Sequence, residues 1–343
     1  MLRSTCAALA ALFLATPVAA QTPLFSESSE LAITIEAPFT TILRTARRNT
    51  DPHPGALIHG DDRYNLMVSS RGMSRRISDA CTFPPIRIDF ENNTLRGTLF
   101  RNQNRLKVTT HCRNGANYEQ YYVLEYTAYR IYNELSPMSF RVRPLRVTYR
   151  DSDGRRDEDT HFGFFIEDDG DMARRNNRVS LDIPTRTVRS PQLDPAAAAR
   201  FALFEYMIAN LDWDMVESAA GRDCCHNSRL LARAEGDHNG VIPVPYDFDY
   251  SGFVSAPYAV PPEGLSVRNV RQRLYRGYCA HNDQLPATIA LFQSRREAIN
   301  AVIAGETRLS EERRQTARRF IDEFYEVIGN SQSVQRQLVD RCR

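Results

Sequence analysis

The chain changes character near its middle, and this change constrains its fold more than any single motif does. Residues 30–110 contain short segments in which apolar and polar residues alternate, as in 86–90, and this pattern is typical of strands. The second half instead places apolar residues at helical spacing, most clearly over 286–304 and 310–329. The sequence therefore predicts an α+β protein, rich in strands first and mainly helical afterwards.

One helix is predicted inside the strand-rich half, over residues 117–135. Asn117 and Gln120 have the spacing of a capping box, and Pro137 ends the segment. Apolar residues at helical spacing should face a core, and Glu125 lies beside that apolar stripe. After this helix, residues 141–150 and 161–168 are predicted to be two strands joined by a charged turn.

Lys107 is the only lysine among the 44 basic residues of the chain. It lies in a predicted strand whose alternation puts Leu106 and Val108 on one face and Lys107 and Thr109 on the other. Arginine replaces lysine on most surfaces, but not where a compact ammonium must fit beside phosphates. Lys107 is therefore a candidate phosphate ligand, and a surviving surface lysine is the alternative.

Residues 1–20 have the pattern of an export signal. Arg3 precedes a short apolar run, and Val18 and Ala20 are the small residues expected before a cleavage site. The run is too short to span a bilayer, and no later segment is long enough. We expect cleavage near Ala20, a mature chain without a transmembrane segment, and a periplasmic or extracellular location.

The predicted mature chain keeps an even number of cysteines, which favours disulfides in an oxidising compartment. Cys81 and Cys112 flank neighbouring predicted strands and are expected to pair. Cys224 or Cys225 is expected to bond with Cys279, and a zinc site formed with His226 is a weaker alternative because adjacent cysteines lack the usual ligand spacing. The six residues are Cys81, Cys112, Cys224, Cys225, Cys279 and Cys342.

The charge balance argues against one class of partner. The chain has 44 basic and 42 acidic residues, mixed along its length, for a net charge of +2. A protein that binds nucleic acid would concentrate basic residues on one face, so we expect no nucleic-acid partner. The mature length suits one large domain or two lobes that share a cleft.

Two acidic segments carry candidate ligands. In VIPVPYDFDYSG, a predicted strand delivers Asp247 and Asp249 into a turn, and alternation puts both carboxylates on one face. Neighbouring carboxylates repel unless a cation lies between them, and Mg²⁺ prefers such oxygen ligands. An ordinary acidic loop at a strand end is the alternative.

The second segment, NLDWD, supplies Asp212 and Asp214 after a helix that Asp194 is expected to cap. Asn227 follows in the same loop, before another predicted strand. A strand lysine, a helix glutamate, a loop aspartate, an asparagine and a later aspartate are the components of phosphoryl transfer.

The order of these segments resembles that of the CotH-type spore-coat kinases, which are secreted or surface proteins with an atypical protein-kinase fold. The resemblance covers about residues 65–255 and implies a two-lobed domain over 21–343. Its N-terminal lobe would span about 30–167, with the helix at 117–135, and its C-terminal lobe about 168–343. The resemblance rests on the segments SSRGMSRR, PPIRIDF, LKVTTH, EYTAYRIYNEL, FGFFIED and PYDFDYSG.

The resemblance implies that Lys107 contacts the phosphates of ATP and is paired with Glu125. Arg71 would help to position the phosphates, since a guanidinium suits them geometrically. These three residues form the predicted nucleotide site.

The resemblance also implies that Asp212 is the catalytic aspartate. Asn227 and Asp247 would bind Mg²⁺ or Mn²⁺, with Asp249 as a further ligand. The expected reaction is transfer of the γ-phosphate of ATP to a hydroxyl of a protein or a glycan.

The chain also departs from the kinase pattern. It lacks a GxGxxG loop, and fifteen residues separate Asp212 from Asn227, where ordinary kinases have about five. Asn210 replaces the usual histidine, and Asp214 competes for the role of base. The alternative function is therefore an inactive kinase-like binding or scaffold protein of the envelope. Transfer of AMP and metal-dependent hydrolysis also stay open.

Overall fold

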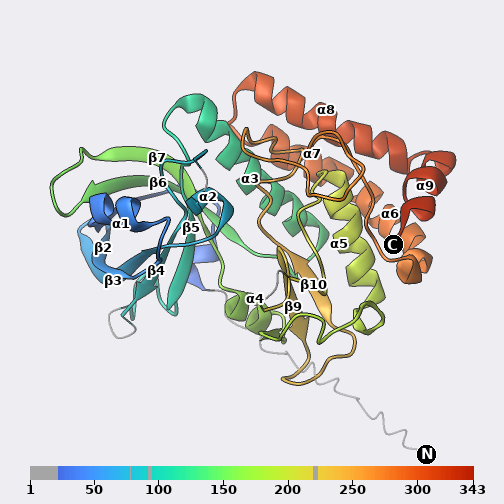
Figure 1. The fold of residues 1–343 in the computed structure, drawn as a ribbon, viewed down its shortest axis with the longest axis horizontal. Coiled ribbons are helices and arrows are strands. Elements are labelled where there is room, and N and C mark those ends of the chain that lie inside the picture. Colours follow the sequence, from blue (N-terminus) through green and yellow to red (C-terminus); the bar gives the residue numbers. More distant parts are fainter. Residues whose placement is uncertain (1–21, 78, 92–94, 219–222) are drawn as a thin grey trace, which may run out of the picture.

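The structure is a computed structural model that describes residues 22–77, 79–91, 95–218 and 223–343. A seven-stranded β-barrel comes first along the chain, and a mainly helical region follows it (Figure 1). The predicted α+β order is confirmed. The predicted export signal, residues 1–20, lies outside the described residues.

The barrel is antiparallel except where it closes. Its strands follow the order β1-β2-β3-β4-β5-β7-β6, and the parallel pairing of β1 with β6 leaves the sheet without an edge. The predicted strand over 86–90 is β4, with alternate residues buried, and the predicted hairpin is formed by β6 and β7. The strands are β1 (Leu31–Ala37), β2 (His53–His59), β3 (Asp62–Ser70), β4 (Ile86–Phe90), β5 (Arg105–Thr109), β6 (Val142–Asp151) and β7 (Asp159–Ile166).

Residues 162–166 of strand β7 are buried on both faces, which explains the continuous apolar sequence of this part of the strand. Phe165 belongs to the core inside the barrel, whereas its neighbour Phe164 belongs to a second core shared with the helical region. There Phe164 packs against Tyr126 and Tyr129 of helix α3, with ring centroids 5.8 Å apart in both pairs. The barrel is thus joined to the helical region through α3.

Helix α3 (Ala116–Leu135) has the predicted length but a different start. Its N-cap is Gly115, and no side chain caps it, so the predicted capping box is wrong. Gln120 instead bonds with the distant loop before α8: its Oε1 accepts from Ser310 N at 2.7 Å. Two short helices, α1 (Phe39–Thr45) and α2 (Ser74–Ile77), lie against the barrel.

The C-terminal region surrounds a small antiparallel sheet with strand order β10-β9-β8. The predicted helix over 286–304 is divided into two helices at Arg295, and the one over 310–329 is α8. The elements are β8 (Val179–Leu181), β9 (Ser228–Ala232), β10 (Ile242–Pro245), α4 (Asp169–Arg175), α5 (Pro195–Met207), α6 (Leu285–Ser294), α7 (Arg296–Ala304), α8 (Glu311–Ile328) and α9 (Ser331–Gln337). Among the helices of the described ranges, none is long and apolar enough to cross a membrane.

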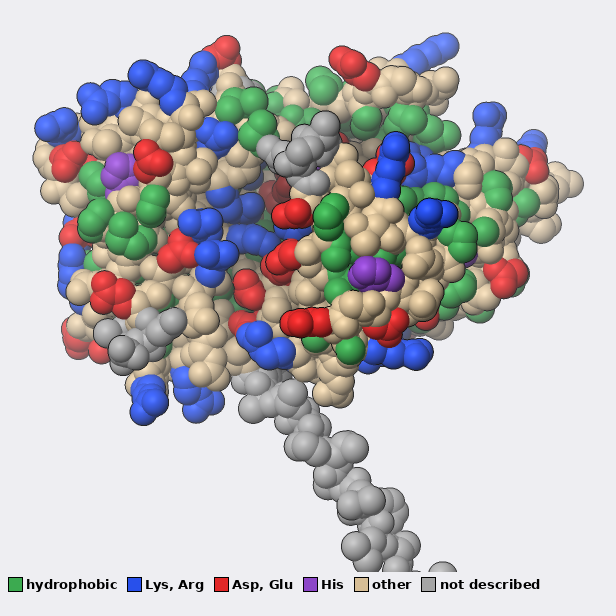
Figure 2. All heavy atoms as spheres, turned by 60° about the horizontal axis from the view of Figure 1, so that its bottom comes forward, with side chains coloured by type: hydrophobic (Ala, Val, Ile, Leu, Met, Phe, Trp, Pro, Cys, Tyr) green, Lys and Arg blue, Asp and Glu red, His purple; other side chains and the backbone are tan. Residues whose placement is uncertain are grey.

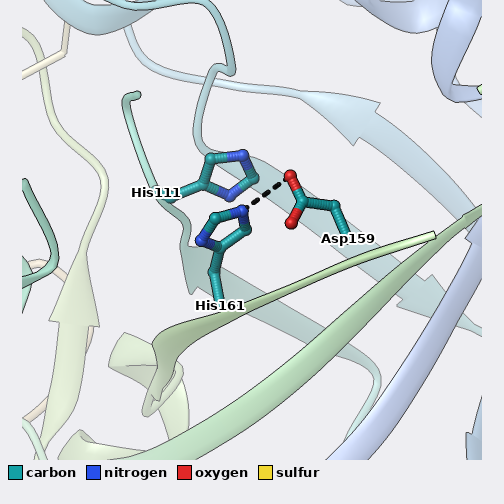
Figure 3. A group of neighbouring side chains, drawn as sticks. All are labelled: His111, Asp159 and His161. Carbon is teal, nitrogen blue, oxygen red and sulfur yellow. Dashed lines mark ion pairs between the residues drawn. The ribbon is translucent and has the colours of Figure 1, made fainter. Parts of the chain in front are cut away.

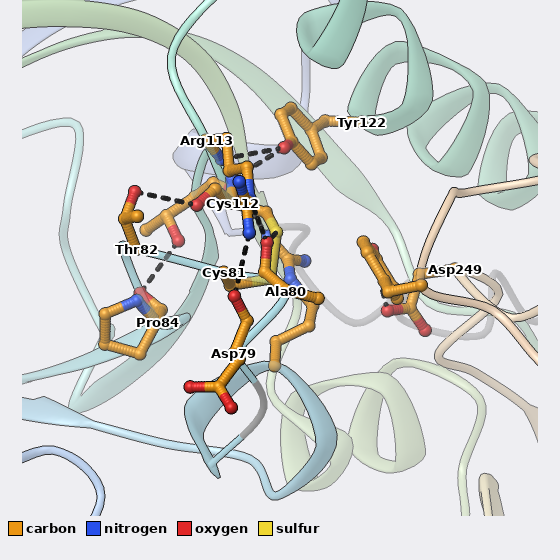
Figure 4. Close-up of a disulfide and its surroundings, with 12 residues drawn as sticks. Asp79, Ala80, Cys81, Thr82, Pro84, Cys112, Arg113, Tyr122 and Asp249 are labelled. Atoms are coloured by element: carbon orange, nitrogen blue, oxygen red, sulfur yellow. Dashed lines mark hydrogen bonds between the residues drawn. A yellow bond between two sulfur atoms is a disulfide. The ribbon is translucent and has the colours of Figure 1, made fainter.

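The predicted disulfide Cys81–Cys112 is confirmed, and it connects the loop before β4 to the end of β5. Figure 4 shows the hydrogen bonds around it. The Cys112 carbonyl accepts from Thr82 N at 2.8 Å, and its N–H donates to the Tyr122 hydroxyl of α3 at 2.7 Å. The bridge therefore holds two barrel segments and gives α3 a fixed contact.

The other cysteines pair differently from the prediction. Cys279 bonds with Cys342, because the C-terminus runs beside it and Arg343 O accepts from Cys279 N at 3.0 Å. Cys224 and Cys225 bond with each other. The expected link from this pair to Cys279 is wrong, and the alternative zinc site is excluded because both thiols are used in a disulfide.

The Cys81–Cys112 bridge closes a loop with a sequence separation of 31 residues. Loop-closure entropy predicts that replacing both cysteines by serine lowers the free energy of unfolding by about 3–4 kcal/mol. Denaturant unfolding of the oxidised proteins, followed by Trp213 fluorescence, would measure this difference. An unchanged midpoint in the double variant would show that the bridge does not constrain the unfolded chain.

Candidate functional site

A cavity of about 350 Å³ lies between the barrel and the C-terminal region. Figure 2 shows a hollow on this face, with basic side chains facing acidic ones across it. The barrel side contributes Arg71 and Arg75, and the C-terminal region contributes most of the carboxylates. The charged residues that line the cavity are Arg71, Arg75, Glu125, Asp182, Asp212, Asp223, Arg229, Asp247 and Asp249.

The loop that carries Asp212 is anchored by the residue that follows it. Trp213 is buried, packs against Phe201 of α5 at 5.1 Å between ring centroids, and donates from Nε1 to Asn210 O at 2.9 Å. Its role is therefore packing. Asn210 Oδ1 also accepts from Asp212 N at 3.1 Å. The backbone of Asp212 is therefore held by this bond and by the buried Trp213 that follows it.

Asp212, His226 and Asn227 form one hydrogen-bonded group. His226 Nε2 lies 2.7 Å from Asp212 Oδ1, and Asn227 Nδ2 donates to Asp212 Oδ2 at 3.0 Å and to Asp212 O at 2.6 Å. The bond with Asp212 raises the pKa of His226 above its usual value. Because the amide nitrogen of Asn227 is bound to Asp212, its side-chain oxygen is the atom left to serve as a ligand.

Asp214, the competing base of the prediction, has a structural role. Its Oδ1 accepts from Val216 N at 2.9 Å and Glu217 N at 3.0 Å, and its Oδ2 pairs with Arg343 at 2.8 Å. It does not belong to the lining of the cavity. Of these two aspartates, Asp212 lines the cavity and Asp214 does not.

The β9–β10 hairpin brings Asn227 and Asp247 together. Tyr246 N donates to Asn227 O at 3.2 Å, one residue beyond the paired strands. Asn227 and Asp247 then adopt positive φ angles of 48° and 67°, a conformation that Asn and Asp accept more readily than most residues. Asp247 N donates to the Tyr129 hydroxyl of α3 at 2.8 Å, which fixes this turn against the helix.

Asp247 and Asp249 both line the cavity, but strand alternation is not the reason. Strand β10 ends at Pro245, and the left-handed backbone at Asp247 redirects the chain. The turn is closed against the end of α5, where Gly252 N donates to Ala209 O at 3.0 Å. A side chain at Gly252 would collide with the backbone of Val270, so the turn requires glycine there.

Glu125 and Asp249 are buried carboxylates in the same part of the cavity. Burial and the neighbouring charge of Asp247 raise the pKa of Asp249 to about 7. Burial also raises the pKa of Glu125 well above its usual value, with Asp249 adding to the shift. Tyr258 donates to Asp249 Oδ2 at 3.1 Å, whereas the buried Oε2 of Glu125 accepts no hydrogen bond from the described residues.

The expected pair of Lys107 and Glu125 is wrong. Glu125 faces Arg75 instead, with Oε2 3.8 Å from Arg75 Nη1. Arg75 is buried, stacks over the Tyr122 ring and donates to Thr110 O, so it is fixed beside the barrel. A guanidinium with several donors suits this enclosed position better than a single ammonium.

Lys107 lies on β5 as predicted, and its Nζ is 3.6 Å from Asp169 Oδ1 at the start of α4. Burial lowers the pKa of Lys107 to about 8. Its Nζ is 5.5 Å from the ring centroid of Tyr246, which lines the cavity, and Arg229 lies over that same ring at 4.7 Å. Lys107 is therefore beside the wall of the cavity, without being part of the lining.

Arg71 follows β3 directly and lines the cavity. The next residue, Gly72, has a φ of 74°, which turns the chain toward α2. The Nε of Arg71 is buried and has no hydrogen-bond partner within the described part of the chain. It is thus a donor available to an anionic ligand.

Sequence reasoning missed three residues that contact the predicted ones. His226 was considered only as a zinc ligand beside Cys224 and Cys225, and nothing in its spacing indicated the bond to Asp212. Arg75 was not identified because the chain contains many arginines and no pattern distinguishes this one. Asp169 had no signal in the sequence either, because its contact with Lys107 depends on the pairing of β7 with β5.

Compared with known protein families and with curated protein sequences, the chain matches none. The chemical reading of the cavity therefore rests on its own residues.

The raised pKa of Asp249 predicts how stability depends on pH. A carboxyl group with a higher pKa in the folded chain binds more protons when folded, so its contribution to stability is lost as pH rises through the folded value. Without divalent metal, we expect Tm to fall as pH rises through about 7. Asp249→Asn, which keeps an acceptor for Tyr258, should show a smaller fall.

Thermal unfolding of both proteins between pH 5 and 8.5 would measure this difference. Glu125 and His226 also have raised pKa values and act in the same direction, so the comparison between the two proteins gives the contribution of Asp249 together with its effect on Glu125. Parallel curves would show that Asp249 is already ionised throughout this range.

Proposed function

We propose that this protein is an exported atypical kinase that transfers the γ-phosphate of ATP to a hydroxyl of a protein or a glycan. The observation that carries the proposal is the shared cavity of Asp212, Asn227, Asp247 and Asp249 with Arg71, residues that are far apart in the sequence. Carboxylate and amide oxygens together with arginines suit a metal–nucleotide complex.

The proposal includes the fold and the location. The barrel with α3 would be the N-terminal lobe of a two-lobed kinase-like domain, and the helical region would be the C-terminal lobe. The resemblance to the CotH-type kinases supports this reading. The disulfides support export to an oxidising compartment, in line with the predicted signal over residues 1–20.

The residues present fit a divalent metal ion. Asp247 and Asp249 lie close enough for the charge of one to raise the pKa of the other, and a hard cation would relieve this repulsion. Asn227 offers a side-chain oxygen beside them. Bound Mg²⁺ or Mn²⁺ would neutralise phosphate charge, and these three residues would hold it.

The residues also fit a polyphosphate. Arg71 has a buried donor without a partner among the residues that the structure describes, and Arg229 and Lys107 add positive charge around Tyr246. These cations would position the phosphates of ATP. Glu125 would act through Arg75 rather than through Lys107, by keeping that guanidinium against the barrel.

Asp212 would act on the acceptor. Its carboxylate would take the proton of the acceptor hydroxyl as the hydroxyl oxygen bonds to the γ-phosphorus and the bond to the β-phosphate bridging oxygen breaks. The products are a phosphate ester and ADP. His226, hydrogen-bonded to Asp212, is placed to receive that proton from the aspartate.

Two observations favour the alternative, an inactive kinase-like envelope binding or scaffold protein. Both oxygens of Asp212 already have partners in His226 and Asn227, and Lys107 pairs with Asp169 rather than Glu125. Such a protein would bind a nucleotide or another anion in the cavity without turnover.

The first test is incubation of the mature, oxidised protein with γ-labelled ATP and Mn²⁺ or Mg²⁺. We expect label on the protein or on a generic acceptor, and none with Asp247→Ala or Lys107→Met. Asp212→Asn should retain binding and lower the rate by roughly 10²–10⁴, because it removes a general base.

Asp61→Ala and Arg101→Met are matched controls, because both residues are exposed on barrel turns and should leave transfer unchanged. A nucleotide-dependent rise in Tm without label would favour the scaffold or the transfer of a different group. No label and no rise in Tm with either metal would contradict a nucleotide site.

The lowered pKa of Lys107 gives a second test. Nearby phosphates favour the ammonium, so nucleotide binding should raise this pKa and take up about half a proton at pH 8. Calorimetry in buffers of different ionisation enthalpy would measure the uptake. Lys107→Arg, which stays protonated, should take up none; equal uptake by both proteins would remove Lys107 from the phosphate site.

A further inference from the structure

A second group of potential ligands lies in the barrel, apart from the cavity described above. His111 follows β5, and Asp159 and His161 belong to β7, which pairs with β5. One ligand atom from each residue lies within 4.8 Å of the other two. In Figure 3 the three side chains point toward one another, with the two imidazoles stacked at 3.8 Å between ring centroids.

The imidazoles are enclosed and incompletely bonded. His111 is 4 % exposed, and its Nδ1 is buried without a hydrogen-bond partner among the described residues. His161 Nε2 lies 2.8 Å from Asp159 Oδ2, and the same carboxylate oxygen accepts from Asn114 Nδ2 at 2.9 Å. A neutral imidazole is the form that binds metal, and a carboxylate held by an outer hydrogen bond is a common partner in such sites.

The group is accessible from solvent through a cavity of about 490 Å³. His111 and Asp159 form part of its lining, together with Phe83, Tyr149 and residues of the β6–β7 turn. Four acidic and two basic residues line this cavity, which favours a cation: Asp151, Asp157, Glu158 and Asp159 against Arg155 and Arg156.

We propose that His111, Asp159 and His161 bind a divalent transition metal ion, with Zn²⁺ as the preferred ion. Two imidazoles and one carboxylate are suitable zinc ligands, and three protein ligands leave a fourth position for water or another ligand. Tetrahedral ligands at about 2.0–2.1 Å from zinc lie about 3.3 Å apart, so binding requires the side chains to close slightly around the ion. His161 would exchange its contact with Asp159 for the metal.

The hard-cation site proposed for Asp247 and Asp249 has a different donor set, and the two sites share no residue. Oxygen ligands select Mg²⁺ or Mn²⁺, whereas imidazole selects Zn²⁺ or Co²⁺. The barrel site can therefore be tested independently of kinase activity, and its failure would leave the proposed function unaffected.

The experiment is titration of chelator-treated, full mature protein with Co²⁺ and then with Zn²⁺. We expect visible absorption typical of tetrahedral Co²⁺ at one ion per chain, lost on addition of Zn²⁺. His161→Ala and Asp159→Asn should weaken Zn²⁺ binding by roughly 100-fold or more, and Asn114→Ala by about 10-fold, as an outer hydrogen bond to a ligand.

His238→Ala is the matched histidine control, since it lies in a turn of the C-terminal region, and Asp247→Ala controls for the other site. Both should bind Co²⁺ and Zn²⁺ like the parent protein. Circular dichroism and Tm establish that each variant is folded, and the nearly isosteric Asp159→Asn decides the matter if His161→Ala does not fold. Absence of Co²⁺ binding in the parent protein would overturn the proposal. So would a Zn²⁺ affinity in folded Asp159→Asn and His161→Ala that equals the affinity of the parent protein.

Discussion

The packing of helix α3 between the barrel and the C-terminal region is the constraint on which the cavity depends. Aromatic residues on one side of α3 pack against β7, and the Tyr129 hydroxyl accepts the N–H of Asp247 from the opposite region. Glu125, one turn earlier, projects into the cavity. A shift of α3 would therefore move a barrel contact, a cavity carboxylate and the turn that carries Asp247 together. The Cys81–Cys112 bridge limits that shift, because Cys112 N donates to Tyr122 of the same helix.

The cavity gathers charges that oppose folding when no ligand is present. Buried carboxylates are costly unless they are paired, and the 3.8 Å contact between Glu125 and Arg75 is longer than a close ion pair. The raised pKa values of Glu125 and Asp249 express the same cost in terms of protons. A ligand of opposite charge would offset this cost. Titratable groups with pKa values shifted in this way concentrate at functional sites.

Local patterns in the sequence were sufficient to predict the helices and strands, but they were insufficient to predict the contacts between them. The strand of Lys107, the extent of α3 and the N-cap at Asp194 follow from alternation, helical spacing and capping chemistry. The partner of Lys107 does not follow from these patterns. The contact with Asp169 depends on the closed strand order, which places β7 and then Asp169 beside β5. Likewise, the Cys279–Cys342 bridge depends on where α9 directs the C-terminus. Asp247 and Asp249 reach one cavity through a left-handed turn, a feature that a period-two pattern cannot represent.

The arrangement of basic and acidic residues around the cavity limits the ligands that fit it more than any single residue does. Arg71 and Arg75 come from the barrel side, and Asp212, Asp247 and Asp249 come from the C-terminal region, where Arg229 of β9 is the one arginine of the lining among the described residues. A simple anion would satisfy the arginines and be repelled by the carboxylates, and a simple cation would meet the reverse difficulty. A polyphosphate chelated to a divalent ion presents negative charge to one wall and positive charge to the other. The same complementarity makes each component bind weakly alone, since either one leaves a charged wall without its counter-ion. Under the proposed function, binding of metal and nucleotide should therefore be mutually dependent in this cavity, whether or not phosphoryl transfer follows.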